Sequence, residues 1–425
     1  MSERAAQFGY IPVATPLAER SGEEVVDELA GGYIPALEQI GGRRRGPEAI
    51  AEAEPLIYFV VTGGTEHQIL ALLEERKRSA PGEPAFLLAH PGNNSLPAAL
   101  ETLARLQQEG ARGRILYLNG PDDKAGLRQI ARAAGDARAF HRLRRARIGL
   151  VGAPSDWLLA SHPDPDTVKK VWGPEVVPVR FEALEDAIEA VPDQALKAPC
   201  DALVSKAVEV REPPETELQD AVLVYLAMKQ LVDLHHLDAV TVRCFDLVEK
   251  RRMTGCFALA RLNDEGVVAG CEGDLVSTTG LLWLQTLLGQ TAWMANPARI
   301  DEGRNALWLA HCTVPLNMTA GFGLRSHFES GLGVSIQGTL KKEAVTLVRI
   351  GGRKMDRLWL AEGDITGAGK DRQLCRTQVR VQLTNSGHVS ELLRRPLGNH
   401  LLLVPGHHAD RLRGWHEMTV GRYPG

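Results

Sequence analysis

The chain has 425 residues, of which 44% are hydrophobic and 24% charged, and its net charge is −4 at pH 7. This composition is that of a globular protein with a large core, and it argues against a nucleic-acid partner, which would call for a basic surface. The longest apolar run, GLLWLQTLLG, is too short to cross a bilayer. Six scattered cysteines without a CxxC pair, and no signal-peptide pattern, predict a cytoplasmic protein.

The first 145 residues alternate apolar strands with amphipathic helices. A buried strand is expected at 55–61 (PLIYFVV), followed by a TGGTE turn and a helix. The segment that ends at His90 (PAFLLAH) repeats this order, and RILYLNGP supplies another strand. Strands that alternate with helices predict a parallel sheet covered on both faces. We therefore expect an N-terminal α/β domain over 1–145.

A second α/β domain is expected over 146–300. It opens with the strand RIGLVG and a turn that could start a helix at Ser155. VVPVRF, ALVSKAVEV and DAVTVRCFD are interpreted as further strands. The segment 215–236 has apolar residues at spacings of three and four, which predicts a helix.

The pattern changes over 301–425. NALWLAHCTV, GVSIQGTL, AVTLVRIGG, RLWLAEGDI, TQVRVQL and HLLLVPG are short, β-rich and separated by turn residues. They predict an antiparallel sheet or barrel. The expected fold class is α/β, with two Rossmann-like parallel-sheet α/β domains followed by a β-rich C-terminal domain.

One group of candidate ligand-binding residues lies in HPGNNSLPA. His90, Asn93 and Asn94 stand where a strand meets a helix, and ligands of open α/β sheets bind at that end. Ser95 also suits an ordinary helix N-cap, so substrate contact and simple capping are both open. The nearby TGGTE turn is neither a GxGxxG motif nor a P-loop and indicates no nucleotide.

Two carboxylates stand in the stretch CEGD. Glu272 follows the apolar strand GVVAGC, and Asp274 immediately precedes a predicted helix. Acidic residues are common in a first helical turn, where the helix dipole favours them. A carboxylate at the end of a buried strand is also a typical metal ligand or base. Both interpretations are kept.

The histidines in the β-rich region are a second source of ligands. His311 ends one predicted strand and His327 precedes another, positions that often hold structural histidines. His400 begins the apolar strand LLLVPG, and His407 and His408 follow it. Adjacent residues of a strand point in opposite directions, so His407 and His408 rarely face one metal together. His400 is the stronger candidate for a buried ligand.

Several of these segments together resemble the L-fucose isomerase family, within the fucose and arabinose isomerase group. The resemblance is strongest in CEGDLVSTTGLLWLQTLLGQTAWMANP, LAHCTVP, HFESGLGVSIQG and GNHLLLVPGHHADRL, and it extends to VVTGGTEHQIL and HPGNNSLPAALETLARLQ. It implies three domains and a divalent metal, usually Mn²⁺ with Mg²⁺ as the alternative. It also implies an aldose–ketose isomerase that acts on a free sugar through an enediol.

The resemblance assigns roles to particular residues. It implies metal ligands at Glu272, at the position of Asn296 and at His400, with acid and base functions for the acidic side chains. This chain departs from the pattern at Asn296, which is neutral and cannot act as a base. Asp274, Asp301 and Asp246 are the candidate replacements, and Glu272 and Asp274 are expected to be the catalytic pair. The residues expected to line the sugar site are His90, Asn93, Asn94, His311 and His327.

The resemblance also implies a homo-oligomer, a trimer or hexamer, with the active site between subunits and the small-molecule sugar as its partner. Two alternatives remain open at this point. One is a lyase or epimerase that uses the same metal site on another carbohydrate. The other is a non-catalytic sugar-binding protein, which the neutral Asn296 favours and the pairing of Glu272 with His400 opposes.

Overall fold

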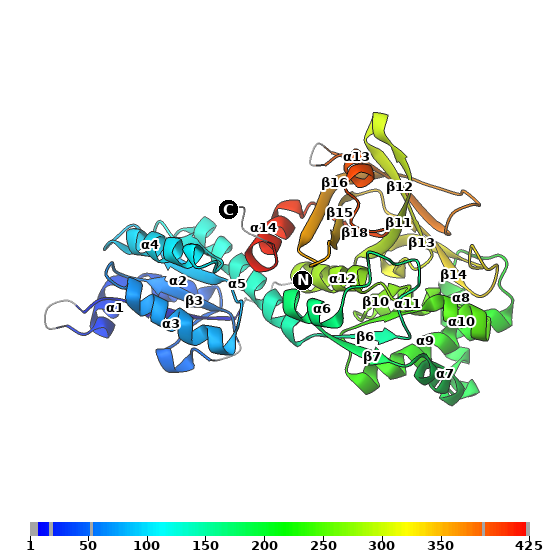
Figure 1. Ribbon diagram of the computed structural model, residues 1–425, viewed down its shortest axis with the longest axis horizontal. Coiled ribbons are helices and arrows are strands. Elements are labelled where there is room, and N and C mark those ends of the chain that lie inside the picture. Colours follow the sequence, from blue (N-terminus) through cyan, green and yellow to red (C-terminus); the bar gives the residue numbers. More distant parts are fainter. Residues whose placement is uncertain (1–6, 17–19, 52–53, 385–386, 422–425) are drawn as a thin grey trace. The chain divides into compact units, whose positions relative to one another are not determined.

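A computed structural model describes residues 7–16, 20–51, 54–384 and 387–421. The contacts divide the chain into two compact units (Figure 1). The first contains residues 1–142 together with 415–423, and the second contains residues 143–414. The expected division into three domains, with boundaries near residues 145 and 300, stays a prediction. None of the described helices is long and apolar enough to cross a membrane.

The first unit is built on a five-stranded parallel sheet with the order β2-β1-β3-β4-β5. Its strands are β1 (Phe8–Val13), β2 (Gly42–Arg44), β3 (Leu56–Val60), β4 (Ala85–Ala89) and β5 (Gly113–Tyr117). Its helices are α1 (Gly22–Ala30), α2 (Tyr33–Gln39), η1 (Pro47–Ala49), α3 (Glu66–Ser79), α4 (Ser95–Gln108), most of α5 (Lys124–Arg145) and the end of α14 (Ala409–Thr419). The predicted strand–helix alternation of this region is present.

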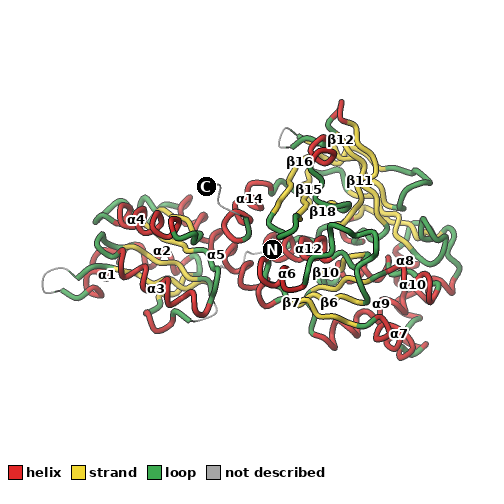
Figure 2. Tube along the Cα trace, viewed as in Figure 1, coloured by secondary structure: helices red, strands yellow, loops and turns green. Residues whose placement is uncertain are grey.

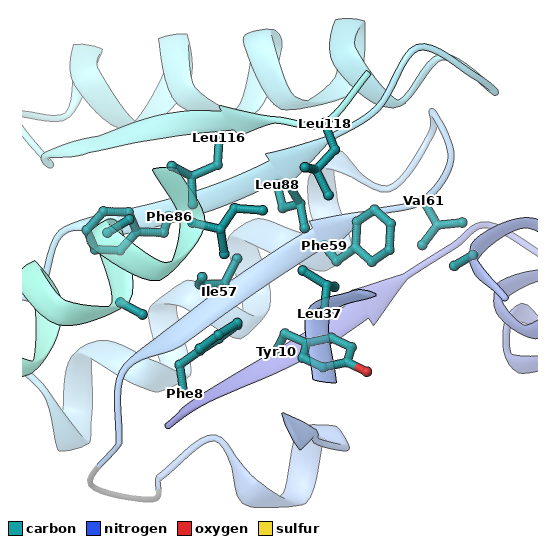
Figure 3. Packing of buried hydrophobic residues seen from close by; sticks show 14 of the residues in the cluster. Phe8, Tyr10, Leu37, Ile57, Phe59, Val61, Phe86, Leu88, Leu116 and Leu118 are labelled. Atoms are coloured by element: carbon teal, nitrogen blue, oxygen red, sulfur yellow. The ribbon is translucent and has the colours of Figure 1, made fainter. Parts of the chain in front are cut away.

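Alternation along the strands gives this sheet two apolar faces. Phe8 and Tyr10 of β1 pack with Ile57 and Phe59 of β3 on one face, as Figure 3 shows. Helices α1, α2 and α5 cover that face, and α3 and α4 cover the other. A side-chain period of two explains why neighbouring residues such as Phe59 and Val60 belong to different cores.

The second unit begins with a four-stranded parallel sheet of order β10-β9-β6-β7. Its strands are β6 (Arg147–Val151), β7 (Glu175–Val179), β9 (Ala239–Val242) and β10 (Val268–Cys271). The helices of this region are α6 (Pro165–Val171), α7 (Phe181–Ala190), η2 (Asp193–Ala195), α8 (Lys197–Lys206), α9 (Glu215–His235), α10 (Cys244–Arg251), α11 (Cys256–Asp264) and α12 (Leu275–Leu288).

The rest of the second unit is antiparallel, apart from one parallel pair. Six strands close into a barrel of order β11-β12-β17-β16-β15-β18, and β14-β13-β8 form a small sheet in which β8 and β13 are parallel. The strands are β8 (Glu209–Val210), β11 (Trp293–Asp301), β12 (Ala306–His311), β13 (Thr319–Arg325), β14 (Ser335–Leu340), β15 (Ala344–Gly351), β16 (Arg357–Ala368), β17 (Thr377–Leu383) and β18 (Leu401–Pro405). The short helices η3 (Glu302–Arg304), η4 (Leu316–Met318) and α13 (Ser390–Arg394) connect them. Figure 2 shows these strands in yellow.

Helix α12 joins the two parts of the second unit. Eleven of its residues are buried, and it packs against β10 of the parallel sheet and against β15 and β18 of the barrel. A helix that is apolar on all sides is expected to be enclosed in this way. The N-terminus of α12 therefore lies where the carboxyl end of β10 meets the barrel.

Two local predictions differ from the structure. The segment 202–210 was expected to be a strand, but α8 occupies most of it and only β8 is extended. Its apolar run is short, and periodicity alone cannot separate a short buried helix from a strand. No helix starts at Ser155; the chain forms turns there. The segment TAWMANP continues into β11, the strand that completes the barrel.

Candidate metal centre

Glu272, His311 and His400 come together in the second unit. Each offers one ligand atom, and these three atoms all lie within 4.8 Å of one another. Glu272 Oε1 is 3.5 Å from His400 Nε2 and 4.0 Å from His311 Nε2. The side chains of both histidines are at most 5% exposed, and that of Glu272 is 12% exposed. The cluster is thus a nearly enclosed group of one carboxylate and two imidazoles.

The topology of the barrel brings the two histidines together. Strand β11 changes partner in this region, because Ala295 pairs with Leu401 of β18 and Asn296 pairs with Ala310 of β12. His311 follows Ala310, and His400 precedes Leu401. Their rings lie 5.5 Å apart between centroids, at an angle of 63°.

Glu272 reaches the same point from the parallel sheet. It follows β10 in a tight turn and has a φ of +65°, a left-handed conformation that is uncommon for residues other than glycine. The next residue, Gly273, also has a positive φ, and a Cβ there would meet Ala153 O and Pro154 Cα at 2.7 Å. Strained backbone of this kind is retained where the surroundings fix it, and it clusters at functional sites.

His400 has one ring nitrogen engaged and one open. Its Nδ1 lies 2.8 Å from Asp274 Oδ2, which as a carboxylate accepts the hydrogen bond. Its fully buried Nε2 has no hydrogen-bond partner of good geometry among the described residues and faces Glu272. An imidazole held by a carboxylate through one nitrogen, with the other directed into a cluster of ligands, is the arrangement of metal-bound histidines.

Asp274 stands behind His400 and is completely buried. As the N-cap of α12, its Oδ1 accepts from the backbone N–H of Ser277, and its Oδ2 accepts from the Ser277 hydroxyl as well as from His400. Arg349 Nη1 lies 3.6 Å from Asp274 Oδ2 and donates to Ser277 Oγ, and Arg349 Nη2 donates to Ser161 Oγ. Its position supports orientation of His400, and the expected acid or base role of Asp274 stays a prediction.

The charges of the cluster depend on each other. Burial opposes ionisation of Asp274, but Arg349 and His400 outweigh it and lower the pKa of Asp274 to about 2. Burial also opposes a charge on His400, yet Asp274 and Glu272 raise the pKa of His400 to about 9. Burial, reinforced by the neighbouring His400 ring, lowers the pKa of His311 to about 4. At neutral pH, His311 is therefore an uncharged imidazole.

The other expected site residues are not among the three side chains of the cluster. The backbone of Asn296 is part of the site through its pairing with Ala310, but its side chain makes no described contact with Glu272 or His400. His327 is buried, its Nδ1 lies 3.1 Å from Ser330 Oγ, and its ring packs on Phe245.

His90, Asn93 and Asn94 belong to the first unit. His90 Nε2 lies 2.9 Å from Val61 O and Nδ1 accepts from Gly92 N–H, so both ring nitrogens are used within the fold. Asn93 and Asn94 both have positive φ. They line a cavity of about 510 Å³ together with Thr15, Thr62, Gly63, Gly64, Glu66, Pro97 and Ala98.

Sequence reasoning missed Trp157 and Arg349. Trp157 Nε1 donates to Glu272 Oε2 at 2.6 Å, from the loop that follows β6. Arg349 stands in the middle of the apolar strand β15 and is 1% exposed. A charged residue inside an otherwise apolar strand was the available signal for Arg349, because buried charges need partners.

The chain is similar in sequence to curated proteins named sulfoquinovose isomerase. It is 24% identical over 302 residues to the one from Priestia megaterium, and the aligned segment covers 69% of this chain and 67% of that protein. It is 23% identical over 326 residues to the one from Alkalicoccus urumqiensis, which covers 75% of this chain and 72% of that protein. No family model matches. These relatives support a relationship to sugar isomerases and do not single out L-fucose isomerases.

Among solved structures, a mutant D-threo-3-hydroxyaspartate dehydratase in the metal-free form aligns with 99% of this chain and 86% of its own at 11% identity. Its TM-score is 0.15, so no argument about the fold follows from it.

Proposed function

We propose that this protein is a metal-dependent aldose–ketose isomerase and that Glu272, His311 and His400 hold the metal. The observation that supports this most strongly is the open Nε2 of His400, buried and directed toward Glu272. A buried polar atom without a partner is costly, and a bound cation would satisfy it. The similarity to sulfoquinovose isomerases supplies the reaction type.

The ligand set narrows the choice of metal. Imidazole nitrogens suit transition ions, whereas Mg²⁺ prefers oxygen ligands. A site with two imidazoles and one carboxylate therefore favours Mn²⁺ or a later divalent transition ion over Mg²⁺. Asn296 is not needed as a ligand in this arrangement, since His311 supplies the third group.

The reaction moves a proton between adjacent carbons of the sugar and needs a base and a means to stabilise negative charge. A bound divalent ion would stabilise the negative charge that develops on the sugar oxygens. Glu272 is the carboxylate of the cluster with access from outside, and burial of its charge is outweighed by His400, which lowers the pKa of Glu272. We assign it the proton transfer. Asp274 orients His400, and His311 is an uncharged ligand at pH 7.

The test is metal content together with isomerisation of free aldoses. The purified protein would be stripped with chelator, reloaded with Mn²⁺, Co²⁺, Zn²⁺ or Mg²⁺, and assayed with a 6-sulfonated hexose, glucose, fucose and arabinose. We expect ketose formation that disappears on stripping and returns with Mn²⁺. Bound metal with no ketose from any aldose would overturn the isomerase in favour of a lyase or epimerase. Neither metal nor turnover would favour a non-catalytic sugar-binding protein.

Metal affinity is expected to rise with pH. The pKa of His400 is raised to about 9, so in the metal-free protein its protonated ring contributes to the free energy of unfolding. This contribution is complete below pH 6.5 and is lost as pH rises through about 9. The metal must displace that proton, so the affinity should increase about tenfold per pH unit from 6.5 to 9 and then level off. Calorimetric titration in two buffers of different ionisation enthalpy measures the affinity and the released proton. An affinity independent of pH over this range would contradict the assignment of His400.

A further inference from the structure

We propose that Trp157 is a positioning and specificity residue of this site: its indole N–H fixes the Glu272 carboxylate, and its exposed ring face is the surface on which the sugar lies. The inference rests on the proposed function and adds to it a residue and a substrate contact. It begins from the 2.6 Å hydrogen bond that Trp157 Nε1 donates to Glu272 Oε2.

This hydrogen bond gives the two carboxylate oxygens of Glu272 different partners. Oε2 is held by Trp157, and Oε1 is the oxygen that faces both His311 and His400. A hydrogen bond to a charged carboxylate is stronger than one between neutral groups and fixes its direction. The carboxylate is thereby presented to the two imidazoles through one defined oxygen.

The loop that carries Trp157 is itself tied to Glu272. The backbone N–H of Ser155 donates to Glu272 O at 2.8 Å. Arg243 clamps the other side of the loop, since it donates to Pro154 O and, through two nitrogens, to both carboxylate oxygens of Asp156. The loop is therefore held against the turn of Glu272, and the position of Trp157 follows from several contacts.

The exposure of Trp157 sets it apart from the other tryptophans. Its residue surface is 50% exposed, whereas Trp172, Trp283, Trp293 and Trp415 are at most 3% exposed. Phe245 packs against Trp157, and the centroids of the two rings lie 5.0 Å apart in a T-shaped arrangement. An indole whose N–H is engaged at the cluster while its surface stays open offers an apolar face beside the reacting carboxylate. Such faces bind the C–H surface of sugars, and a few polar groups then fix orientation.

Two variants separate the two roles. Trp157→Phe removes the N–H and keeps an aromatic face, and Trp157→Ala removes both. Trp308→Phe is the matched control, because Trp308 is a partly buried tryptophan of β12 in the same unit. Metal affinity is measured by titration of Mn²⁺ without sugar, KM and kcat are measured on the best aldose of the panel, and thermal melting checks folding.

We expect Trp157→Phe to weaken Mn²⁺ binding about 10- to 100-fold and to leave KM within about twofold, since only the hydrogen bond to Glu272 is lost. Trp157→Ala should show the same loss of Mn²⁺ affinity and a KM raised about tenfold or more. Saturating sugar should change the intrinsic fluorescence of the wild type and of Trp308→Phe, but not that of Trp157→Phe.

Three results overturn the proposal. Mn²⁺ affinity of Trp157→Phe equal to that of the wild type would remove the positioning role while the isomerase stands. A KM of Trp157→Ala equal to that of Trp157→Phe would remove the sugar-binding face. A wild type that binds no Mn²⁺ would overturn both this inference and the metal-dependent function, and so is distinguishable from the first two.

Discussion

Glu272→Gln is expected to lower kcat/KM for aldose isomerisation about 10³-fold or more, and to weaken Mn²⁺ binding by more than about 100-fold. Glutamine keeps the shape of the side chain and can still accept the Trp157 N–H. It loses the negative charge that faces His311 and His400, and it cannot take up a proton. Steady-state kinetics with saturating Mn²⁺ and calorimetric titration of the metal give the two values.

The control for this variant is Glu343→Gln, which removes the same charge from an exposed position just before β15. Its activity and Mn²⁺ affinity should match those of the wild type. Isomerase activity of Glu272→Gln within tenfold of the wild type at saturating Mn²⁺ would show that another group carries the proton.

Asp274→Asn is expected to destabilise the protein by about 3–5 kcal/mol and to weaken Mn²⁺ binding about 10- to 100-fold. The loss of stability arises because Arg349, whose side chain is 2% exposed, remains as a buried cation without its carboxylate. The loss of affinity arises because the amide no longer fixes the orientation and tautomer of His400 as a carboxylate does. Denaturant unfolding and metal titration measure the two effects separately.

A double variant separates stability from metal binding. Replacing both partners, Asp274→Asn with Arg349→Met, removes the uncompensated charge and should recover a large part of the lost stability. The Mn²⁺ affinity should stay low, because Asp274 is still absent behind His400. Recovery of full Mn²⁺ affinity in the double variant would mean that Asp274 acts only on stability.

The alternation of strands and helices was enough to predict the mixed α/β character of the chain. Apolar runs such as those of β3 and β4 are bounded by glycine and proline turns, and the long helix α9 has a clear apolar period. The β-rich character of the last third was also predicted from its short strands. The sequence left an antiparallel sheet and a barrel as alternatives, because the pairing partners of a strand depend on contacts far along the chain.

The candidate site shows the same division. Local pattern made Glu272 and His400 candidates, and the family resemblance then implied that both are metal ligands. His311 was expected in the sugar site but not among the metal ligands, since its closeness to His400 depends on β11 changing partner between β18 and β12. Nor could the sequence show that Asp274 faces His400, a residue 126 positions away. Local patterns find the groups that a site can use, and the register of distant strands decides which of them meet.

At Glu272, the left-handed backbone conformation and the carboxylate side chain favour different residues. Glycine or asparagine would relieve the local strain there, typically about 1 kcal/mol or more, but either would remove the carboxylate. Selection for stability alone would therefore favour replacement of Glu272, whereas the proposed role in metal binding and proton transfer would favour its retention. We expect relatives that keep this fold but have lost the proposed reaction to carry glycine or asparagine at this position. The residue found there would then distinguish active from inactive relatives.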